Sequence, residues 1–315
     1  FKLMKATLLI RCLNEINNLK ILFPILEAQE DPNFEIVFID SGSTDGSYEY
    51  VKNYDSKIPI ILAKIDKAEF SFGKSLNMAA EKSTFKNILI SLSAHCFPTD
   101  NMWFKNIISE FNNPKVRIVF GKQIGDKKSV LSESAHLNSW FGNKSGLRSS
   151  PFINNGNSAF RYETWESFKF NEDLTGCEDI DFAQRVINTD GLIYYSSDSV
   201  VTHYHNEDIR QIRNRYRRES QALRNIFIDD IEFSLLDLMK STFKETYSDI
   251  QFKKENIFPK SNLFNILIYR YNKNLGHYLG INHPLASTKV IQNNYYSYSD
   301  GKIYTDNFKK DYFYK

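Results

Sequence analysis

The chain has 315 residues, of which 42% are hydrophobic and 25% are charged, and its formal net charge is +2. This composition is that of a globular protein with enough core for one large domain or two smaller ones. The nearly balanced charge excludes a protein-wide basic field, so we expect no nucleic-acid partner.

Cysteine usage bears on the compartment. Cys12, Cys96 and Cys177 lie far apart, are odd in number and form no CxxC motif, which argues against a disulfide framework. The sequence shows neither an apolar run long enough to span a bilayer nor a signal-peptide pattern. We therefore expect a cytoplasmic protein.

Short apolar runs alternate with helical periodicity in the first part of the chain. Leu76, Ala79 and Ala80 illustrate the helical spacing of apolar residues between the runs. Continuous apolar strands alternating with amphipathic helices predict an α/β fold whose mostly parallel sheet is covered by helices on both faces. Strands are predicted at residues 5–13, 34–40, 58–63, 87–93 and 116–121.

Polar residues follow several of these strands where each strand ends. Ligands of such sheets bind beyond the carboxyl ends of the strands, so this edge is the predicted site. The residues concerned are Asn14, Glu15, Asp40, Ser41, Ser93 and His95.

The second half of the chain is less regular. Residues 125–155 are polar and predict a long loop near the site, and a helix is predicted from Glu178 to Asp190. Residues 191–205 are interpreted as a pair of strands that ends at His203 and His205. We predict a first domain at 1–206 and a helical C-terminal extension with an aromatic-rich tail at 207–315.

Five segments carry a family resemblance: "TLLIRCLNE", "EIVFIDSGSTDGS", "FSFGKSLNMAAE", "GNSAFR" and "TGCEDIDFAQRV". In this order and spacing, over roughly residues 6–205, the chain resembles the inverting nucleotide-sugar glycosyltransferases of family 2, which have the Rossmann-like GT-A fold. It is similar to the rhamnosyltransferase-like group that acts on bacterial surface polysaccharides. Members of that group often have a helical tail with a stretch like "NLGHYLG" at 274–280.

The resemblance implies roles for individual residues. Asp179, within "EDID", matches the catalytic base, Asp40 matches the acid that hydrogen-bonds the nucleobase, and Glu15 matches an acid near the nucleoside. Two positions depart from the pattern: Ser41 stands where many members have a second Asp, and Leu76 replaces an Arg. The remaining expected donor-binding residues are Arg11, Asn14, Ser41, Lys74, Asn77, Ser93 and His95. Support for the diphosphate or acceptor is expected from Asn157, Glu178, His203, Arg210, Arg213 and Arg217.

The chemistry explains why a carboxylate is needed. An acceptor hydroxyl is a poor nucleophile until a base within hydrogen-bond reach removes its proton in the transition state. In-line attack inverts the anomeric centre, and the negative charge that grows on the leaving diphosphate must be neutralised by a metal, by cationic side chains or by helix N-termini.

Metal use is the open question, because the family's Asp-x-Asp is replaced by Ser93-Ala94-His95. Serine and alanine are poor ligands for divalent metals, whereas a neutral histidine is a good one. We expect little or no metal dependence, with an arginine stripe, Lys74 and a histidine cation binding the phosphates. The stripe is formed by Arg210, Arg213, Arg217 and Arg224, which recur at helical spacing. The alternative is Mn²⁺ or Mg²⁺ held by His95 together with His203 or His205.

We therefore expect an inverting glycosyltransferase that takes a sugar from a nucleotide-sugar donor. Its acceptor would be a hydroxyl of a bacterial surface glycan, such as a capsule or a lipopolysaccharide O-chain. The basic, aromatic C-terminal part is expected to contact a membrane that carries a lipid-linked acceptor, which gives a peripheral location at the inner face. The alternatives are a catalytically inactive sugar- or nucleotide-binding scaffold and a nucleotidyltransferase, although "IRCLNEINN" lacks the Gly-rich loop of the latter.

Overall fold

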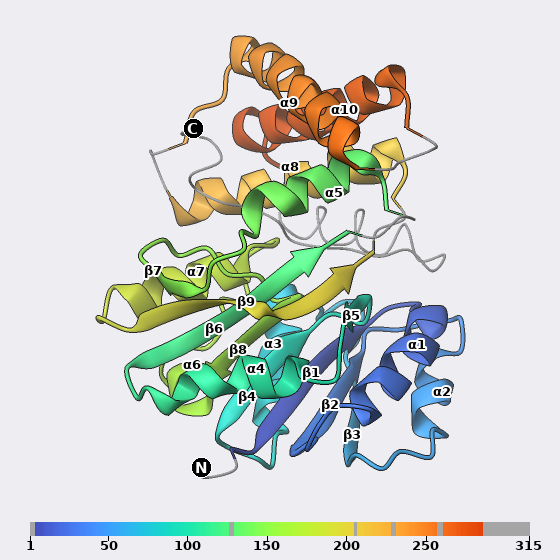
Figure 1. Cartoon of the computed structure of the whole chain (residues 1–315), viewed down its shortest axis with the longest axis vertical. Helices are drawn as coiled ribbons and strands as arrows, with labels where there is room; N and C mark the ends of the chain where they lie inside the picture. Colours follow the sequence, from blue (N-terminus) through green and yellow to red (C-terminus); the bar gives the residue numbers. More distant parts are fainter. Residues whose placement is uncertain (1–3, 126–128, 205–206, 228–230, 257–260, 286–315) are drawn as a thin grey trace.

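The computed structural model describes residues 4–125, 129–204, 207–227, 231–256 and 261–285. A nine-stranded sheet with helices on both faces forms the larger part of these residues, and the C-terminal helices lie together beyond one end of it (Figure 1). Within the described ranges, no helix combines the length and the hydropathy needed to cross a bilayer.

The strands are β1 (Ala6–Cys12), β2 (Phe34–Asp40), β3 (Ile60–Lys64), β4 (Ile88–Leu92), β5 (Cys96–Pro98), β6 (Val116–Ile124), β7 (Gly146–Arg148), β8 (Asn157–Arg161) and β9 (Leu192–His203). The helices are α1 (Ile16–Glu27), α2 (Ser47–Lys52), α3 (Phe72–Glu81), α4 (Trp103–Ser109), the 3₁₀ turn η1 (Glu110–Asn112), α5 (Leu131–Trp140), α6 (Tyr162–Phe168), α7 (Glu178–Ile187), α8 (Ile209–Ile226), α9 (Leu235–Glu255) and α10 (Leu263–Asn282).

The strand order is β3-β2-β1-β4-β8-β6-β9-β5, with β7 also paired to β9. The first four strands in this order run parallel, and Cys12 at the end of β1 lies opposite Asp40 at the end of β2. β8 lies antiparallel between β4 and β6, so the predicted parallel sheet is continued by a mixed half. The expected α/β architecture with a C-terminal helical part is confirmed.

Both faces of the sheet are covered because successive strand residues point to opposite sides. Leu8 and Ile10 of β1 pack in a core with α1 and α4, whereas Leu9 packs in a second core with α3 and α7. β1 is therefore apolar at nearly every position, which is the pattern that predicted a strand covered on both sides.

Two local expectations are wrong. Residues 125–155 are not one long loop, because they contain α5 and β7. Most of α5 is buried on all sides, including Ser132, Glu133 and His136, so it has no apolar stripe for a sequence pattern to reveal. The predicted strand pair at 191–205 is the single strand β9, which bulges against β6 between Ser196 and Val200 instead of turning.

The "NLGHYLG" stretch forms a packing seam between α8 and α10. A Cβ at Gly276 would collide with the carbonyl oxygen of Arg213, and one at Gly280 with that of Arg217. Glycine at these positions therefore lets the two helix backbones approach closely.

A buried network of charges joins α5 to the C-terminal helices. Arg215 lies 3.2 Å from Glu133 of α5 and 2.8 Å from Glu207, while Arg270 of α10 lies 2.5 Å from Asp249 of α9. Burial alone would lower the pKa of Arg215, but the adjacent Glu207 and Glu133 carboxylates raise it above its ordinary value. α5 thus packs with the helices beyond residue 206, although the proposed boundary lies after it in the chain.

Candidate active site

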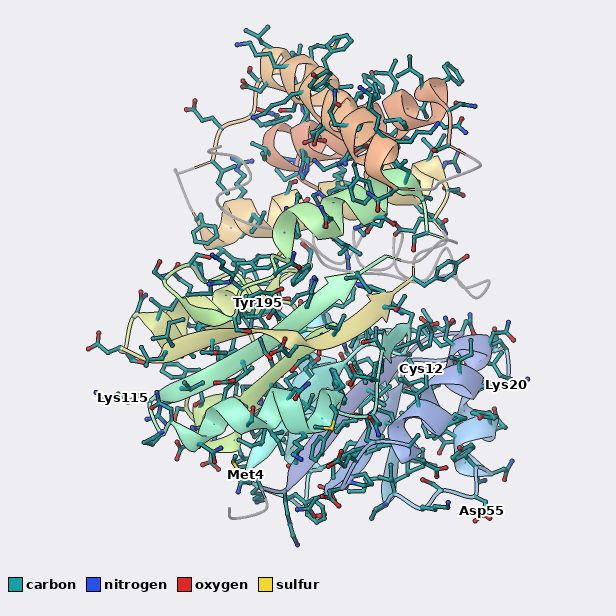
Figure 2. The ribbon with its side chains drawn as sticks, viewed as in Figure 1. Met4, Cys12, Lys20, Asp55, Lys115 and Tyr195 are labelled. Carbon is teal, nitrogen blue, oxygen red and sulfur yellow. The ribbon has the colours of Figure 1, made fainter. Side chains whose placement is uncertain are left out.

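The candidate site lies at the carboxyl edge of the parallel strands. Figure 2 shows β1 running from Met4 at the lower end to Cys12 above it, so this edge faces the C-terminal helices. We call α5, α8, α9 and α10 together the helical layer. Asn14 follows β1 in the left-handed conformation, with φ of 57°, and its Oδ1 accepts the Thr44 N–H at 2.7 Å. The loop after β1 is thereby tied to the loop after β2, and Asp40 lies at the base of both.

Asp40 combines anchored and available acceptor atoms. Its Oδ2 accepts the backbone N–H groups of Gly42 and Ser43 at 3.0 and 3.1 Å. Its Oδ1 is buried, and none of the residues described in the structure donates a hydrogen bond to it. Since a buried carboxylate oxygen needs donors, Oδ1 suits a ligand N–H such as that of a nucleobase. The neighbouring Ser41 hydroxyl donates to the Cys12 carbonyl at 2.8 Å, which holds the two strand ends together.

Glu15 and His95 form a buried pair at the position of the missing Asp-x-Asp. Glu15 Oε1 lies 3.0 Å from His95 Nδ1, and Glu15 Oε2 accepts the Asn18 amide at 2.5 Å. Because the carboxylate accepts, His95 carries a proton on Nδ1. Ser93, two residues earlier, is half-buried, and its backbone N–H lies 3.4 Å from the Gly156 carbonyl.

His203 lies beside His95 because β5 pairs with the end of β9, where Cys96 is opposite His203. The two imidazole rings stack with centroids 5.2 Å apart and an interplanar angle of 17°. His203 Nδ1 donates to Gln123 Oε1 at 2.5 Å, and the Gln123 amide donates to Asn154 Oδ1 at 2.6 Å. His205, the other predicted partner of His95, lies outside the described residues.

The histidine pair bears on the metal question. No cluster of three or more His, Cys, Asp or Glu side chains with metal-binding geometry occurs in the described part of the chain. Glu15 and Gln123 nonetheless fix the Nδ1 atoms of both rings, which makes Nε2 the nitrogen through which each ring can coordinate. Such outer-shell partners are typical of histidines that bind metals. The pair therefore supplies two imidazole groups, a donor type that divalent transition metals accept.

Asp179 lies in the first turn of α7. Its Oδ2 accepts the Asn155 backbone N–H at 3.0 Å and its Oδ1 accepts the Ile180 N–H at 2.9 Å, so the carboxylate has a fixed orientation. Glu178 beside it is fully buried, and its Oε1 lies 3.2 Å from the Asn155 amide and 3.4 Å from Arg11 of β1.

Asn155 connects α7 to the strand ends. Its carbonyl accepts the Ser91 hydroxyl of β4 at 2.6 Å, and its side-chain oxygen accepts the Ser158 hydroxyl at 3.1 Å. Asp179 is thus held at the end of β4, the strand that leads to His95. Asn154, Asn155 and Gln123 were not predicted from the sequence. The asparagine-rich run "NNGNS" was a signal for the two asparagines, and Gln123 had none.

Two predicted site asparagines, Asn77 at the donor and Asn157 at the diphosphate or acceptor, have packing roles in the structure. Both ends of the Asn77 amide form hydrogen bonds, among them bonds with Trp165 and Phe170, and these join α3 to α6 and to the segment after it. Asn157 accepts from Trp103 and donates to the Lys122 and Ser199 carbonyls. These contacts explain both residues without a ligand, and we do not include them in the proposed site.

The predicted cationic residues are spread over different surroundings. Arg210 is exposed and Arg213 is half-buried, whereas Arg217 donates to the His283 carbonyl at 2.7 Å and so binds the C-terminal end of α10. Lys74, in the first turn of α3, lies 3.4 Å from Glu69. The predicted arginine stripe is therefore not a single phosphate-binding row.

A different arginine of α8 reaches the start of α7. The guanidinium of buried Arg218 lies 4.4 Å from the centroid of the Phe72 ring, and that of Arg11 lies 5.2 Å from the same ring. The Thr175 hydroxyl donates to the Arg218 carbonyl at 3.2 Å. Thr175 lies two residues before Cys177, the αL residue that immediately precedes α7. α8 thus supports the segment that carries Glu178 and Asp179.

Two rhamnosyltransferases are similar to this chain in sequence. The chain is 25% identical over 230 residues, 68% of its length and 70% of the relative's, to the O-antigen chain rhamnosyltransferase RfbN of Salmonella typhimurium. It is 25% identical over 207 residues, 62% of its length and 64% of the relative's, to the O-antigen chain rhamnosyltransferase WbaN of Salmonella anatum.

Solved structures share the fold at low sequence identity. A mannosyltransferase from Pyrobaculum calidifontis, in complex with GDP-Man and Mn²⁺, aligns with a TM-score of 0.59 and 17% identity over 93% of this chain and 88% of that one. S. aureus TarS 1–349, in complex with UDP-GlcNAc, aligns with a TM-score of 0.55 and 15% identity over 96% and 93%.

The family is shown by the sequence itself. The profile of glycosyl transferase family 2 matches residues 7–171, which is more than half of the chain and includes the strand ends that carry Asn14, Asp40 and His95. The chain belongs to glycosyl transferase family 2 and is a glycosyltransferase with a GT-A-like fold.

Proposed function

We propose that the enzyme transfers a sugar, with inversion, from a nucleotide-sugar donor to a hydroxyl of a bacterial surface glycan. The observation that carries this proposal is the hydrogen-bonded chain from Asp179 through Asn155 to the end of β4, at the same sheet edge as Asp40. The named relatives support an O-chain acceptor and make rhamnose the first sugar to test.

In this proposal Asp179 is the base and the strand ends hold the donor. Asp179 accepts the proton of the acceptor hydroxyl as that oxygen attacks the anomeric carbon from the side opposite the diphosphate. Asp40 Oδ1 accepts a base N–H, which fits the imino group of uracil or thymine and the amino group of cytosine alike. Arg11 pairs with Glu178 and so helps to keep the start of α7 in place, and the Arg218 carbonyl accepts from Thr175 just before it.

We also infer that His95 and His203 would hold a divalent cation in the presence of the donor diphosphate. When bound, it supplies positive charge to the leaving diphosphate. The oriented histidine pair thereby favours the alternative over our expectation of metal independence. Because imidazole nitrogen suits the later transition metals better than Mg²⁺, we expect Co²⁺ to be more effective than Mg²⁺, with Mn²⁺, which binds nitrogen less tightly than Co²⁺, between them.

Chelation tests this inference. EDTA should abolish transfer, Mn²⁺ should restore it, and the Mn²⁺-dependent rise in melting temperature with nucleoside diphosphate should vanish in His95→Ala. Full activity in EDTA would return us to phosphate binding by cationic side chains alone.

The donor is best identified by a thermal-shift screen against UDP, GDP, dTDP and CMP, each with and without Mn²⁺. Donor hydrolysis should then follow for the matching nucleotide sugar, and NMR of the transferred sugar should show an inverted anomeric centre. Nucleotide binding without hydrolysis or transfer to any glycan would support the inactive scaffold instead. Release of pyrophosphate from a nucleoside triphosphate would support the nucleotidyltransferase.

We propose a cytoplasmic location with peripheral contact to the membrane. The three cysteines are buried and none of them forms a disulfide with another, which agrees with a reducing compartment. A lipid-linked acceptor would bring the enzyme to the membrane surface. The predicted aromatic tail lies outside the described residues.

A further inference from the structure

The outward face of α9 carries an unusual set of exposed apolar side chains. At 100° per residue, Leu236, Met239, Phe243 and Tyr247 fall within an arc of about 80°. Each of the four is between 45% and 65% exposed, and Leu235 beside them is 61% exposed. Single exposed apolar residues are ordinary, but a continuous stripe over three turns of one helix marks an interaction surface.

Charge is segregated across the same helix. Lys240 and Lys244 are exposed along one edge of the stripe, and Lys254 is exposed near its end. The acidic residues Glu245 and Asp249 point the other way, toward Arg270 and Lys273 of α10. Asp237 is half-buried and accepts from Ser234 at the N-terminus of the helix. Among the described side chains of α9, the exposed charges are therefore all positive.

The apolar surface continues onto the start of α10. Leu263 and Phe264 are 59% and 68% exposed, and Lys253 of α9 donates to the Ser261 carbonyl just before them. α9 lies at the end of the molecule farthest from β1–β4 (Figure 1), so a planar partner can reach this face without meeting the sheet.

We propose that this face of α9 docks onto an anionic lipid bilayer. An apolar stripe bordered by lysines is the pattern of helices that lie in the membrane interface, with aromatic rings at headgroup level and lysine stems extended along the apolar surface. A second copy of the chain fits less well, because a two-fold contact would bring the lysine edges of both copies into one interface. The proposal rests on the proposed function only in that a lipid-linked acceptor gives the docking a purpose.

Vesicle flotation of the full chain tests the proposal. It should float with vesicles that contain one-third phosphatidylglycerol and much less with pure phosphatidylcholine, and its binding should weaken from 50 to 500 mM salt. Lys240→Glu/Lys244→Glu and Leu236→Ser/Phe243→Ser should each lower the partition coefficient about tenfold or more.

Matched controls lie on the opposite end of the molecule. Lys20→Glu/Lys52→Glu reverses two exposed lysines of α1 and α2, and Ile21→Ser removes an exposed isoleucine of α1, and both should bind vesicles like the wild type. No flotation of the wild type at low salt, or equal loss in the controls, overturns the proposal. A wild-type dimer that becomes a monomer in Leu236→Ser/Phe243→Ser, without vesicle binding, would assign the face to a second copy. Hydrolysis of a soluble nucleotide sugar should be unchanged in all four variants, so a failure of the proposed function is seen separately in the wild type.

Discussion

Buried charge is used differently at the sheet edge and in the helical layer. In the layer, cations and carboxylates neutralise one another: Arg215 contacts Glu133 and Glu207, and Arg270 contacts Asp249 and Glu245. At the sheet edge, Asp40 and Asp179 each accept two backbone N–H groups. The layer is balanced within itself, whereas the edge has acceptors suited to a ligand.

This difference changes how the arginines of α8 are interpreted. Spacing alone made Arg210, Arg213 and Arg217 equivalent members of a basic stripe. The structure gives the arginines of this helix three different surroundings: Arg210 is exposed, Arg217 caps α10, and Arg215 is buried in the charge network. Clustering of arginines therefore indicated a helix rich in contacts, and a phosphate role for Arg210 and Arg213 stays a prediction.

The contrast between the sheet edge and the helical layer predicts its largest effect at Asp179. Asp179→Asn keeps the size of the side chain and can keep one of its two backbone N–H contacts, but it removes the basic carboxylate, so turnover should fall about 10²–10⁴-fold with donor affinity little changed. The measurement is steady-state transfer together with calorimetry of nucleotide binding.

The control is Asp181→Asn, in the same first turn of α7. Asp181 forms an ion pair with Arg185 at 2.7 Å, so it shares the helix dipole with Asp179 but belongs to a balanced pair. Its loss should leave turnover within about threefold, since such partly exposed pairs contribute only about 0.2–1 kcal/mol. Equal effects in both variants would mean that Asp179 serves the helix and not the reaction.

Substitutions of buried charges in the helical layer should lower the stability of the fold and should not act on the reaction directly. Arg215→Met leaves Glu133 and Glu207 buried beside an apolar side chain, which should lower the free energy of unfolding by about 3–5 kcal/mol. Chemical denaturation measures this loss. Arg210→Met, on the exposed side of the same helix, should change stability by less than about 0.5 kcal/mol. If Arg210→Met weakens nucleotide binding, the predicted diphosphate contact of Arg210 is restored and the contrast fails.

Local patterns predicted much of the fold. Continuous apolar runs identified β1, β2 and β4 because strands covered on both faces need apolar residues at nearly every position. They did not identify β8 or the three-residue β5 and β7, whose pairing depends on distant partners. α5 was missed because its buried polar residues are satisfied by α8 and α10, which begin many residues later.

The candidate site was also predicted only in part. Residues that directly follow strands, such as Asp40 and His95, were found because the ends of parallel strands meet at one edge. Asn155 and Gln123 were not, since their importance lies in contacts with Asp179 and His203 that no local spacing encodes. Glu15 was assigned to the nucleoside from the resemblance, and the structure adds its pairing with His95.

Asp40 offers a smaller effect at the nucleotide. Asp40→Ala removes the buried Oδ1 acceptor, and loss of a hydrogen bond to a charged group should weaken nucleoside diphosphate binding about 10–100-fold. Calorimetry measures this, and exposed Asp66→Ala in a nearby loop should bind like the wild type. Unchanged affinity in Asp40→Ala would remove Asp40 from the donor site.

Glu35, at the opposite end of β2, completes the comparison because it is a buried carboxylate with every acceptor used. It accepts from the Thr7 hydroxyl at 2.7 Å, from the Thr84 N–H at 2.6 Å and from the Phe85 N–H at 2.9 Å. Burial opposes its charge, but the hydrogen bonds from Thr84, Phe85 and Thr7 outweigh it and lower the pKa of Glu35 below its ordinary value. Glu35→Gln places an amide donor among these donors and should destabilise the fold by about 1–3 kcal/mol without changing nucleotide affinity.

The pH dependence separates this effect from simple packing. A carboxylate whose pKa is lowered by folding stabilises the native state above its unfolded pKa, about 4.3, and loses that contribution as the pH falls through the lower folded value. The stability difference between wild type and Glu35→Gln should therefore be largest near pH 7 and shrink in the acid range, as measured by chemical denaturation between pH 7 and pH 3. Glu30→Gln, which breaks an exposed pair with Lys105, should show almost no difference at any pH. A Glu35→Gln difference that stays constant down to pH 3 would show that shape rather than charge holds this end of β2, and Glu35 would then no longer serve as the saturated counterpart of Asp40.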